Sequence, residues 1–412
     1  MSVMDSLRAF VIAVLAAVIV GMTFLSGFAT GAVFMIHEAT PTPVPPAATP
    51  LPDEEAQFQI FWEAWHLIEE NFDGSIPDTR TRTYGAIEGM LRTLGDDHTV
   101  LLSPEYSAIF NEDLSGSFEG IGASVRTREE DGKVLIAELF KGQPAEQAGL
   151  KVGDAILAVD GVTLQGLNLY EAIALIRGPE GTIVHLTIER EGLDQPFDVE
   201  VKRARIEIPL VETKMLEGDI GYISLFEFSE PAPARFRKAL QELLAQKPRG
   251  LVLDLRENPG GYLDVAVSIG SEFIGDGLIL RVRSHGDQEV EHPATGNGVA
   301  LDIPMAVLVD GGTASASEIV AGALQDNGRA VLIGEQTFGK GTVQVGYTLS
   351  DGAELRVTIS HWFTPNGRAI EKEGLTPDIV VEMTEADHEA ERDPQLERAV
   401  EYLMAQTVVE KD

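Results

Sequence analysis

The chain has 412 residues, which is long enough for two or three domains with buried cores. Its 66 acidic and 31 basic residues give a formal net charge of −35, which argues against nucleic acid as a partner. The same charge balance argues against a basic patch that binds anionic lipid. The chain has no cysteine, so disulfides, thiolate nucleophiles and cysteine-ligated metals are excluded.

The N-terminal segment predicts a membrane anchor over residues 1–36. Residues 9–36 carry no charged side chain, a length sufficient to cross a bilayer with some tilt. Arg8 precedes this stretch and an acidic chain follows it, which favours an anchor in a bacterial cell envelope with the rest of the chain outside the cytoplasm. Cleavage near Ala29 or Ala32 is the alternative and would give a secreted protein. A Pro-rich linker follows over residues 37–52.

Residues 53–112 predict a helical region. Apolar residues recur at helical spacing over residues 58–72, and a second helical stretch over residues 84–95 ends in glycine. His66 and His98 lie in or just after these stretches, and isolated histidines in such positions are more often structural than metal ligands. No metal site is expected.

Residues 113–203 resemble a PDZ domain. Short strands alternate with turn signals and two short helical segments in this stretch. In the sequence FEGIGASV, Gly120 and Gly122 flank Ile121 just before a strand, so that backbone amides can converge on an anion. PDZ domains bind a peptide C-terminus as an added strand, with its carboxylate in the glycine loop. The resemblance therefore assigns Gly120, Ile121 and Gly122 to the binding of a substrate C-terminus.

Strand–helix alternation after residue 206 predicts a layered α/β core over residues 204–384. The fold class as a whole is thus multidomain α/β (α+β). Residues 385–412 predict a C-terminal helix that docks on the core, caps it or contributes to a homo-oligomer.

Three glycine-rich turns follow expected strands of this core: ENPGG at 257–261, VDGGTAS at 309–315 and TFGKGT at 337–342. Glycine lets backbone amides approach a reacting atom closely, so three such turns in one domain indicate a built site. TFGKGT lacks the spacing of a P-loop, and the strands carry no Rossmann fingerprint. A nucleotide is therefore not expected, and the chain needs no other cofactor.

Ser315, in the stretch TASASEIVAG, has two interpretations. Ser315 and Glu318 fit a capping box at a helix start, in which Glu318 reaches back to the Ser315 amide. A serine at the first turn of a helix is also placed where the helix dipole stabilises negative charge on or near its oxygen. The amide of Ala316 would then point to where an oxyanion could form.

A nucleophilic serine needs a proton acceptor, and Lys340 is a candidate. Gly339 and Gly341 flank it after an expected buried strand. A lysine in an apolar pocket loses hydration, its pKa falls, and the neutral amine can act as a general base. Serine–lysine pairs are a known variant of the catalytic triad. Taken alone, Lys340 is more simply a surface hairpin lysine.

Taken together, three stretches resemble the carboxyl-terminal processing peptidases, also called tail-specific proteases. They are DLRENPGG, VDGGTASASEIVAGALQDNGRAVLIGEQTFGKGTVQ and FTPNGRAIEKEGLTPDI, and the likeness covers about residues 53–385. The resemblance implies a serine endopeptidase with a PDZ domain and a protease core of the ClpP/crotonase-like type. Its substrates would be proteins with exposed apolar C-termini, cleaved near that end.

Carried over to this sequence, the resemblance makes Ser315 the nucleophile, Lys340 the general base and Gln344 the residue that orients the lysine. Asp326 matches an acidic position that supports the site structurally.

The resemblance also implies an oxyanion hole. Ala316 would contribute one backbone amide, and either Gly260 or Gly261 would contribute the other; the sequence leaves open which glycine.

Two rival functions remain open at this point. One is a PDZ-type peptide-binding scaffold whose core is inactive, which the presence of serine, lysine and glutamine at the expected spacing opposes. The other is a serine–histidine hydrolase that uses His361 or His292 as its base.

Overall fold

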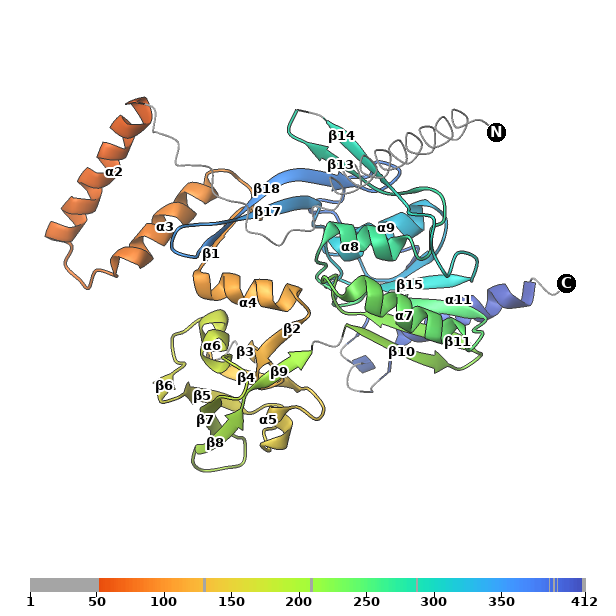
Figure 1. The fold of residues 1–412 in the computed structure, drawn as a ribbon, viewed down its shortest axis with the longest axis horizontal. Coiled ribbons are helices and arrows are strands. Elements are labelled where there is room, and N and C mark those ends of the chain that lie inside the picture. The colour runs from red at the N-terminus through yellow and green to blue at the C-terminus, as the bar shows by residue number, and fades with distance from the viewer. Residues whose placement is uncertain are drawn as a thin grey trace, which may run out of the picture.

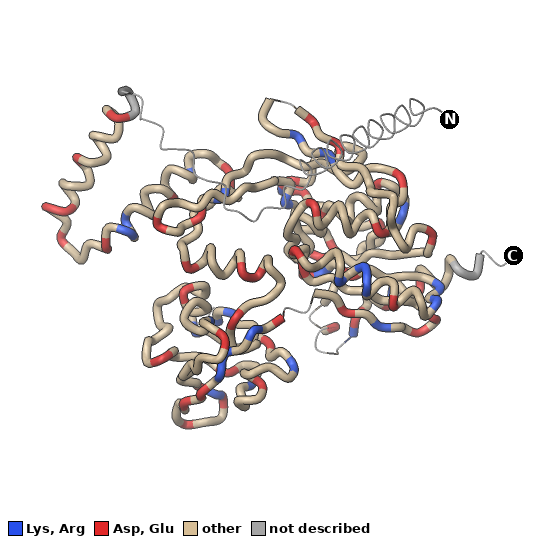
Figure 2. The backbone as a smooth tube through the Cα atoms, in the orientation of Figure 1, with Lys and Arg blue, Asp and Glu red and all other residues tan. Residues whose placement is uncertain are grey.

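The computed structural model describes residues 52–409, except 129–130, 208–209, 287, 385, 388–389 and 391. The expected membrane anchor lies outside these residues. Within the described range, no helix combines the length and the apolar character that a bilayer span requires. Acidic residues are spread over all parts of the described chain (Figure 2), so the net charge of −35 is not confined to one patch.

The N-terminal region is helical, as expected, but it also contributes a strand to the core. Asp78 begins one helix by accepting a hydrogen bond from the Thr81 amide, and Ser103 begins another by accepting from Tyr106. The strand β1 pairs with β18, more than two hundred residues later in the chain. The elements are α2 (Pro52–Asn71), α3 (Thr79–Arg92), β1 (Val100–Leu102) and α4 (Pro104–Leu114). Helix α2 extends away from the rest of the molecule (Figure 1).

The second region is a six-stranded antiparallel sheet in which five strands run in the order β3-β4-β5-β7-β8 and β6 pairs with β5. Strand β3 is at its edge, and a separate pair of strands, β2 and β9, connects this region to the core. Its strands are β2 (Ser117–Gly120), β3 (Ala123–Thr127), β4 (Val134–Leu139), β5 (Ala155–Val159), β6 (Val162–Thr163), β7 (Ile183–Glu189), β8 (Phe197–Lys202) and β9 (Ala204–Glu207); its helices are α5 (Pro144–Gln147) and α6 (Leu169–Ile176).

The core contains a six-stranded sheet in the order β10-β11-β12-β15-β16-β19. All neighbours pair in parallel except β10 and β11. The strands are β10 (Val211–Leu216), β11 (Ile220–Leu225), β12 (Gly250–Asp254), β15 (Met305–Val309), β16 (Val331–Gly334) and β19 (Ile379–Val380). Every residue of β12 and β15 is buried, as expected of parallel strands covered on both faces.

Helices cover both faces of this sheet. Leu251 and Leu253 pack in one cluster with Phe236, Ile269 and Val320 of the helices on one face. Val252, which points the opposite way, packs with residues of the C-terminal helix on the other face. The helices are α7 (Ala232–Leu244), α8 (Leu263–Gly270) and α9 (Ala316–Asp326) on the first face, and α11 (Pro394–Val409) on the second.

An antiparallel sheet lies against the same helices and completes the layers. Ile279 and Trp362 of this sheet are buried in the cluster that contains α7, α8 and α9. Its strands run in the order β1-β18-β13-β14, with β17 paired to β18. They are β13 (Leu278–Ser284), β14 (Glu289–Pro293), β17 (Thr342–Thr348) and β18 (Glu354–Phe363).

The layered core brings the three glycine-rich turns together. They follow β12, β15 and β16, which are neighbouring parallel strands, so the turns meet at the carboxyl edge of one sheet. This edge is where open α/β sheets place their ligand sites.

Candidate active site

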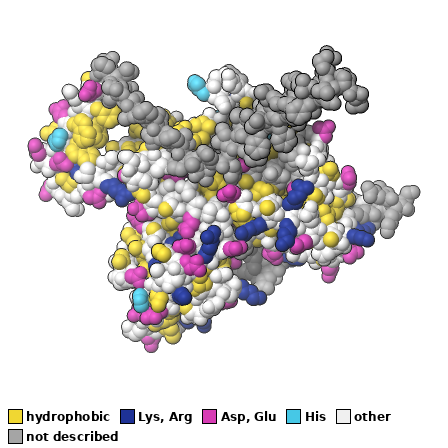
Figure 3. Space-filling model, in the orientation of Figure 1, with side chains coloured by type: hydrophobic (Ala, Val, Ile, Leu, Met, Phe, Trp, Pro, Cys, Tyr) yellow, Lys and Arg dark blue, Asp and Glu magenta, His cyan; other side chains and the backbone are white. Residues whose placement is uncertain are grey.

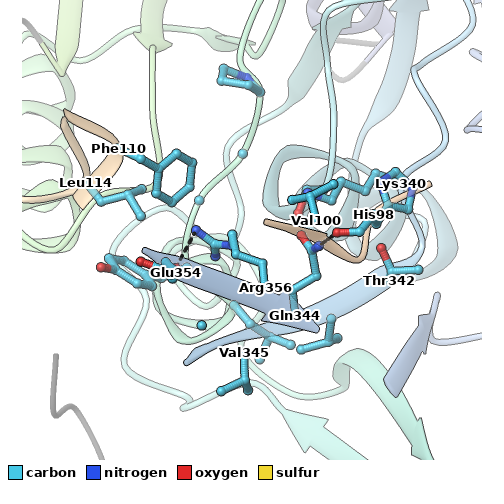
Figure 4. Close-up of a pocket in the computed structure, with 18 of the residues that line it drawn as sticks. His98, Val100, Phe110, Leu114, Lys340, Thr342, Gln344, Val345, Glu354 and Arg356 are labelled. Atoms are coloured by element: carbon cyan, nitrogen blue, oxygen red, sulfur yellow. Dashed lines mark hydrogen bonds and ion pairs between the residues drawn. The ribbon is translucent and has the colours of Figure 1, made fainter. Parts of the chain in front are cut away.

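A cavity of about 1000 Å³ lies at this edge. Ser315, Lys340 and Gln344 all line it, as do Gly260 and Gly261 of the ENPGG turn. Figure 4 shows its wall of strands β17 and β18, with Phe110 and Leu114 of α4 also lining the cavity. The fold thus brings residues from three separate turns to one concave site.

Ser315 lies at the turn between β15 and α9, immediately before the first residue of the helix. Its φ of 54° is in the left-handed region, which costs a non-glycine residue about 1–3 kcal/mol. The Glu318 carboxylate accepts a hydrogen bond from the Ser315 amide at 2.9 Å, so Glu318 reaches back as the capping box predicts. The Asp310 carboxylate fixes the turn before Ser315, because it accepts hydrogen bonds from the amides of Gly312 and Thr313.

The backbone amides of Gly261, which lines the cavity, and of Ala316, which follows Ser315, are candidate oxyanion donors. Within the described part of the chain, the amides of Ala316 and Gly261 donate no hydrogen bond. The Gly260 amide, in contrast, donates to the Asn258 side-chain oxygen at 2.9 Å. Gly260 nevertheless lies against the serine turn, because a Cβ added there would come within 2.8 Å of the Ala316 nitrogen.

Lys340 lies on the turn between β16 and β17, with a largely buried side chain. Burial lowers the pKa of its amine, the positive charge of Arg356 lowers it further, and the carboxylates of Glu371 and Asp96 oppose this. The Lys340 amide donates to Glu318 at 2.9 Å, and its carbonyl accepts from the Trp362 indole at 3.0 Å. A lowered lysine pKa increases the fraction of neutral amine that can accept a proton.

Gln344 lies on β17, and its side-chain amide donates to the backbone carbonyl of His98 (Figure 4). None of the hydrogen bonds between described residues joins Gln344 to Lys340. The orienting role of Gln344 therefore stays a prediction, for which its side-chain oxygen is the available acceptor.

The other residues singled out from the sequence lie elsewhere. Asp326, at the end of α9, accepts hydrogen bonds from Asn366 and Arg368, and so fastens that turn to the helix that begins beside Ser315. His361 and His292 are on β18 and β14, and neither lines the cavity.

A second cavity, of about 340 Å³, lies between β3 and α6. Its lining is mostly apolar and includes Ile121, Phe140 and Ile173. The amides of Ile121 and Gly122 donate no hydrogen bond within the described chain, so both are available to an anion. Gly122 has a φ of 75°, and a Cβ there would come within 2.4 Å of Gln143, so only glycine fits.

Glu227 and Pro259 line both cavities, which makes the two adjacent. Burial raises the pKa of the Glu227 carboxyl to about 7, and the negative charge of Asp113 adds to this effect. Helix α4 also connects the two regions, because its Glu112 and Asp113 pair with Arg177 beyond the end of α6 at 2.9 and 2.6 Å. Arg177 therefore joins helix α4 of the N-terminal region to the second region.

Sequence reasoning missed three residues of the site. Asn258 is fully buried and ties the ENPGG turn to the serine turn, since its carbonyl accepts from the Ala314 amide and the Ser317 hydroxyl. Its position between Glu257 and a proline in that motif was the available signal. His98 and Arg356 also line the cavity; the sequence favoured a structural role for His98, and no local pattern marks Arg356.

Comparison with known proteins identifies the family of two regions of the chain. Residues 219–381 match the model of peptidase family S41, and residues 136–190 match a PDZ domain. The carboxy-terminal processing protease CtpA of Bacillus subtilis is 38% identical over 331 residues, which cover 80% of this chain and 70% of the relative.

The chain belongs to the carboxyl-terminal processing proteases of family S41.

Two further similarities support the same assignment of this protease. A carboxyl-terminal-processing protease of Synechocystis is 41% identical over 324 residues, covering 77% of this chain and 75% of the relative. The solved structure of a photosystem II D1 C-terminal processing protease has a TM-score of 0.51 at 30% identity, covering 81% of this chain and 94% of that one. The protein is thus a serine peptidase with a PDZ domain and a mixed α/β fold.

Proposed function

We propose that this protease cleaves its substrates with Ser315 as nucleophile and Lys340 as general base. The observation that carries the proposal is the shared cavity, which Ser315, Lys340 and Gly261 all line. The amides of Gly261 and of Ala316, the residue after Ser315, donate to no acceptor within the described chain. The lowered pKa of Lys340 supports its role as a base.

The chemistry would proceed in two halves. The neutral Lys340 amine takes the proton of the Ser315 hydroxyl as its oxygen bonds to a peptide carbonyl carbon. The amides of Ala316 and Gly261 stabilise the resulting oxyanion. Collapse breaks the carbon–nitrogen bond, and the lysine returns its proton to the leaving amine. Water then attacks the acyl-enzyme, with Lys340 again as base, and releases Ser315.

The PDZ domain would capture the substrate by its C-terminal tail. An edge strand, an apolar groove and free amides at Ile121 and Gly122 support strand addition with carboxylate capture. Glu227 and Pro259 border both cavities, so a chain held in the groove can extend toward Ser315. The preferred tail would be apolar, like the groove.

Amidation of the substrate C-terminus should weaken this capture. The full-length protease is given a flexible substrate that ends in valine, with either a free or an amidated carboxyl end. Removal of the carboxylate charge should raise KM about 10-fold or more, because charge-assisted hydrogen bonds to it are lost. Steady-state cleavage followed by mass spectrometry measures the effect. Equal KM values for the two substrates would refute tail recognition by the carboxylate.

The rate of cleavage should rise with pH. Below the pKa of Lys340 the amine is protonated and cannot act as a base, so kcat/KM should increase about tenfold per pH unit and then level off. Arg356→Gln removes a positive charge that lowers this pKa, so the rise should move to higher pH. A pH series from 6 to 10 on both proteins tests this. A profile that is flat, or that does not move in the variant, would contradict a lysine base.

We further propose that residues 1–36 anchor the protease in a bacterial cell envelope with its catalytic part outside the cytoplasm. The uncharged stretch 9–36 and the preceding Arg8 support this arrangement. The layered sheet and helices support a core of the ClpP/crotonase-like type.

Self-association of the protease is also part of this proposal. Helix α2 carries large apolar side chains at its surface (Figure 3), which supports contact with a second copy. These residues are Phe58, Ile60, Trp62, Leu67 and Ile68, and Phe72 is exposed directly after the helix.

A further inference from the structure

Glu318 is a fully buried carboxylate next to the site, with an exposed fraction of 0%. It lies in the first turn of α9, and its two oxygens accept four hydrogen bonds. A carboxylate has about four acceptor positions, so the four donors satisfy it completely. Such complete satisfaction of a buried carboxylate indicates a specific role, because a half-satisfied one would be costly.

The four donors come from the two segments that carry the proposed nucleophile and base. One oxygen of Glu318 accepts from the amides of both Ser315 and Lys340, each at 2.9 Å. The other oxygen accepts from the Thr337 hydroxyl at 2.5 Å and from the Gly339 amide at 2.8 Å. A single atom thus joins the backbone of the serine turn to that of the lysine turn.

Other hydrogen bonds also hold the lysine turn: the Phe338 amide donates to the Thr313 carbonyl at 3.0 Å, and the Gly341 amide donates to Glu371 at 2.7 Å. Thr337 accepts from the Leu375 amide at 2.7 Å while it donates to Glu318, so its hydroxyl is fixed in direction. Gly339 has a φ of 89°, and a Cβ there would come within 2.8 Å of the Gly374 nitrogen. Within the described chain, the Glu318 carboxylate is the contact that joins the Lys340 amide itself to the Ser315 amide.

Glu318 forms no ion pair with any described residue. Burial raises the pKa of its carboxyl, whereas the bonds from Thr337, Lys340, Gly339 and Ser315 lower it. The positive end of the α9 dipole further favours the charged form. The four donors therefore stabilise the Glu318 carboxylate, and the carboxylate fixes the positions of the four donors.

We propose that Glu318 is a positioning residue that sets the separation of Ser315 and Lys340 by binding both of their amides through one oxygen. This inference rests on the proposed serine–lysine pair. Glu318 touches no substrate; it acts through the backbone that carries the two reacting side chains.

Glu318→Gln should reduce catalysis without reducing capture of the tail. Glutamine keeps the shape but has one oxygen and one NH₂ group, so its NH₂ must face either two fixed amides or Thr337 and Gly339. In the first orientation the serine turn and the lysine turn each lose a bond, and in the second the lysine turn loses its bonds from Thr337 and Gly339. A displacement of about 1 Å in an active site can cost about 100-fold in kcat. We expect that loss in kcat with KM unchanged, and the same loss in the rate of Ser315 labelling by a fluorophosphonate.

Glu272→Gln is the matched control, since Glu272 is also a buried carboxylate of the core but lies outside the cavity lining. It bonds to Arg237 and should keep the wild-type kcat at a temperature where both variants are folded. Thr337→Val removes one donor and should cost about tenfold in kcat, by the loss of one of four anchoring bonds, whereas Thr337→Ser should restore the rate.

The outcomes distinguish the positioning role of Glu318 from the proposed Ser315–Lys340 pair. A Glu318→Gln variant within threefold of wild type, beside an inactive Ser315→Ala variant, would overturn the positioning role and leave the serine–lysine pair intact. Activity in Ser315→Ala or Lys340→Ala would instead overturn the pair. If Glu318→Gln does not fold, a full rate in Thr337→Val would still refute the positioning role. An equal loss in Glu272→Gln would refute it too.

Discussion

Ser315→Ala and Lys340→Ala should each lower kcat for tail cleavage by about 10⁴-fold or more, as for other residues that act together in one catalytic unit. Alanine at 315 removes the attacking oxygen, and alanine at 340 leaves the hydroxyl without a proton acceptor. Neither residue lines the PDZ groove, so binding of the tail should be unchanged. Cleavage and fluorescence binding of the same labelled substrate by the full-length protein measure both quantities.

Three further variants make this prediction specific. The double variant Ser315→Ala/Lys340→Ala should be no slower than either single one, since each already disables the same step. Lys340→Arg should also be inactive, because a guanidinium does not lose its proton at accessible pH. His361→Ala should keep the wild-type rate, since His361 lies outside the cavity lining. If His361→Ala alone abolished cleavage in a folded protein, the lysine base would be wrong.

Gly260→Ala should cost about 10²–10³-fold in kcat, comparable to the loss of one oxyanion donor. Its φ of 101° is unfavourable for alanine, and the new Cβ would come within 2.7 Å of the Ala314 oxygen and 2.8 Å of the Ala316 nitrogen. Both are backbone atoms that cannot rotate away, so the serine turn must shift and carry the Ala316 amide with it. KM should change little, because the PDZ groove is separate.

Gly311→Ala is the matched control for this substitution. Gly311 lies in the neighbouring VDGGTAS turn, and a Cβ there meets nothing within 4 Å. Its kcat should therefore equal that of the wild type. Equal rates for Gly260→Ala and Gly311→Ala would show that the close approach of Gly260 to the serine turn has no catalytic role.

The assembly of the three turns could be predicted from the sequence because parallel strands put their carboxyl ends at one edge. Ser315 at the start of α9 and the return of Glu318 to its amide also follow from local sequence, since a capping box spans only three residues. The second set of contacts of Glu318 could not be predicted, because Thr337 and Gly339 approach it only through the tertiary fold.

Other parts of the site depend on contacts that no local pattern encodes. The sequence left open which glycine would face the oxyanion, and our proposal of Gly261 depends on the Asn258 side chain, which accepts from the Gly260 amide. His98 lies in the cavity wall because β1, which follows it, pairs with β18. A three-residue strand is too short for its hydrophobic pattern to be recognised in the sequence. That pairing also determines the partner of the Gln344 amide.

The pairing of β1 with β18 has a consequence for the order in which the protease is made. Val100 pairs with Arg356, so strand β1, which contributes to the cavity wall, cannot pair until β18 has been synthesised near the end of the chain. The PDZ domain between them can fold first, since domains generally fold as units during synthesis. The nascent chain therefore has a folded PDZ domain before its cavity is complete. We expect no cleavage of other proteins until translation is nearly complete.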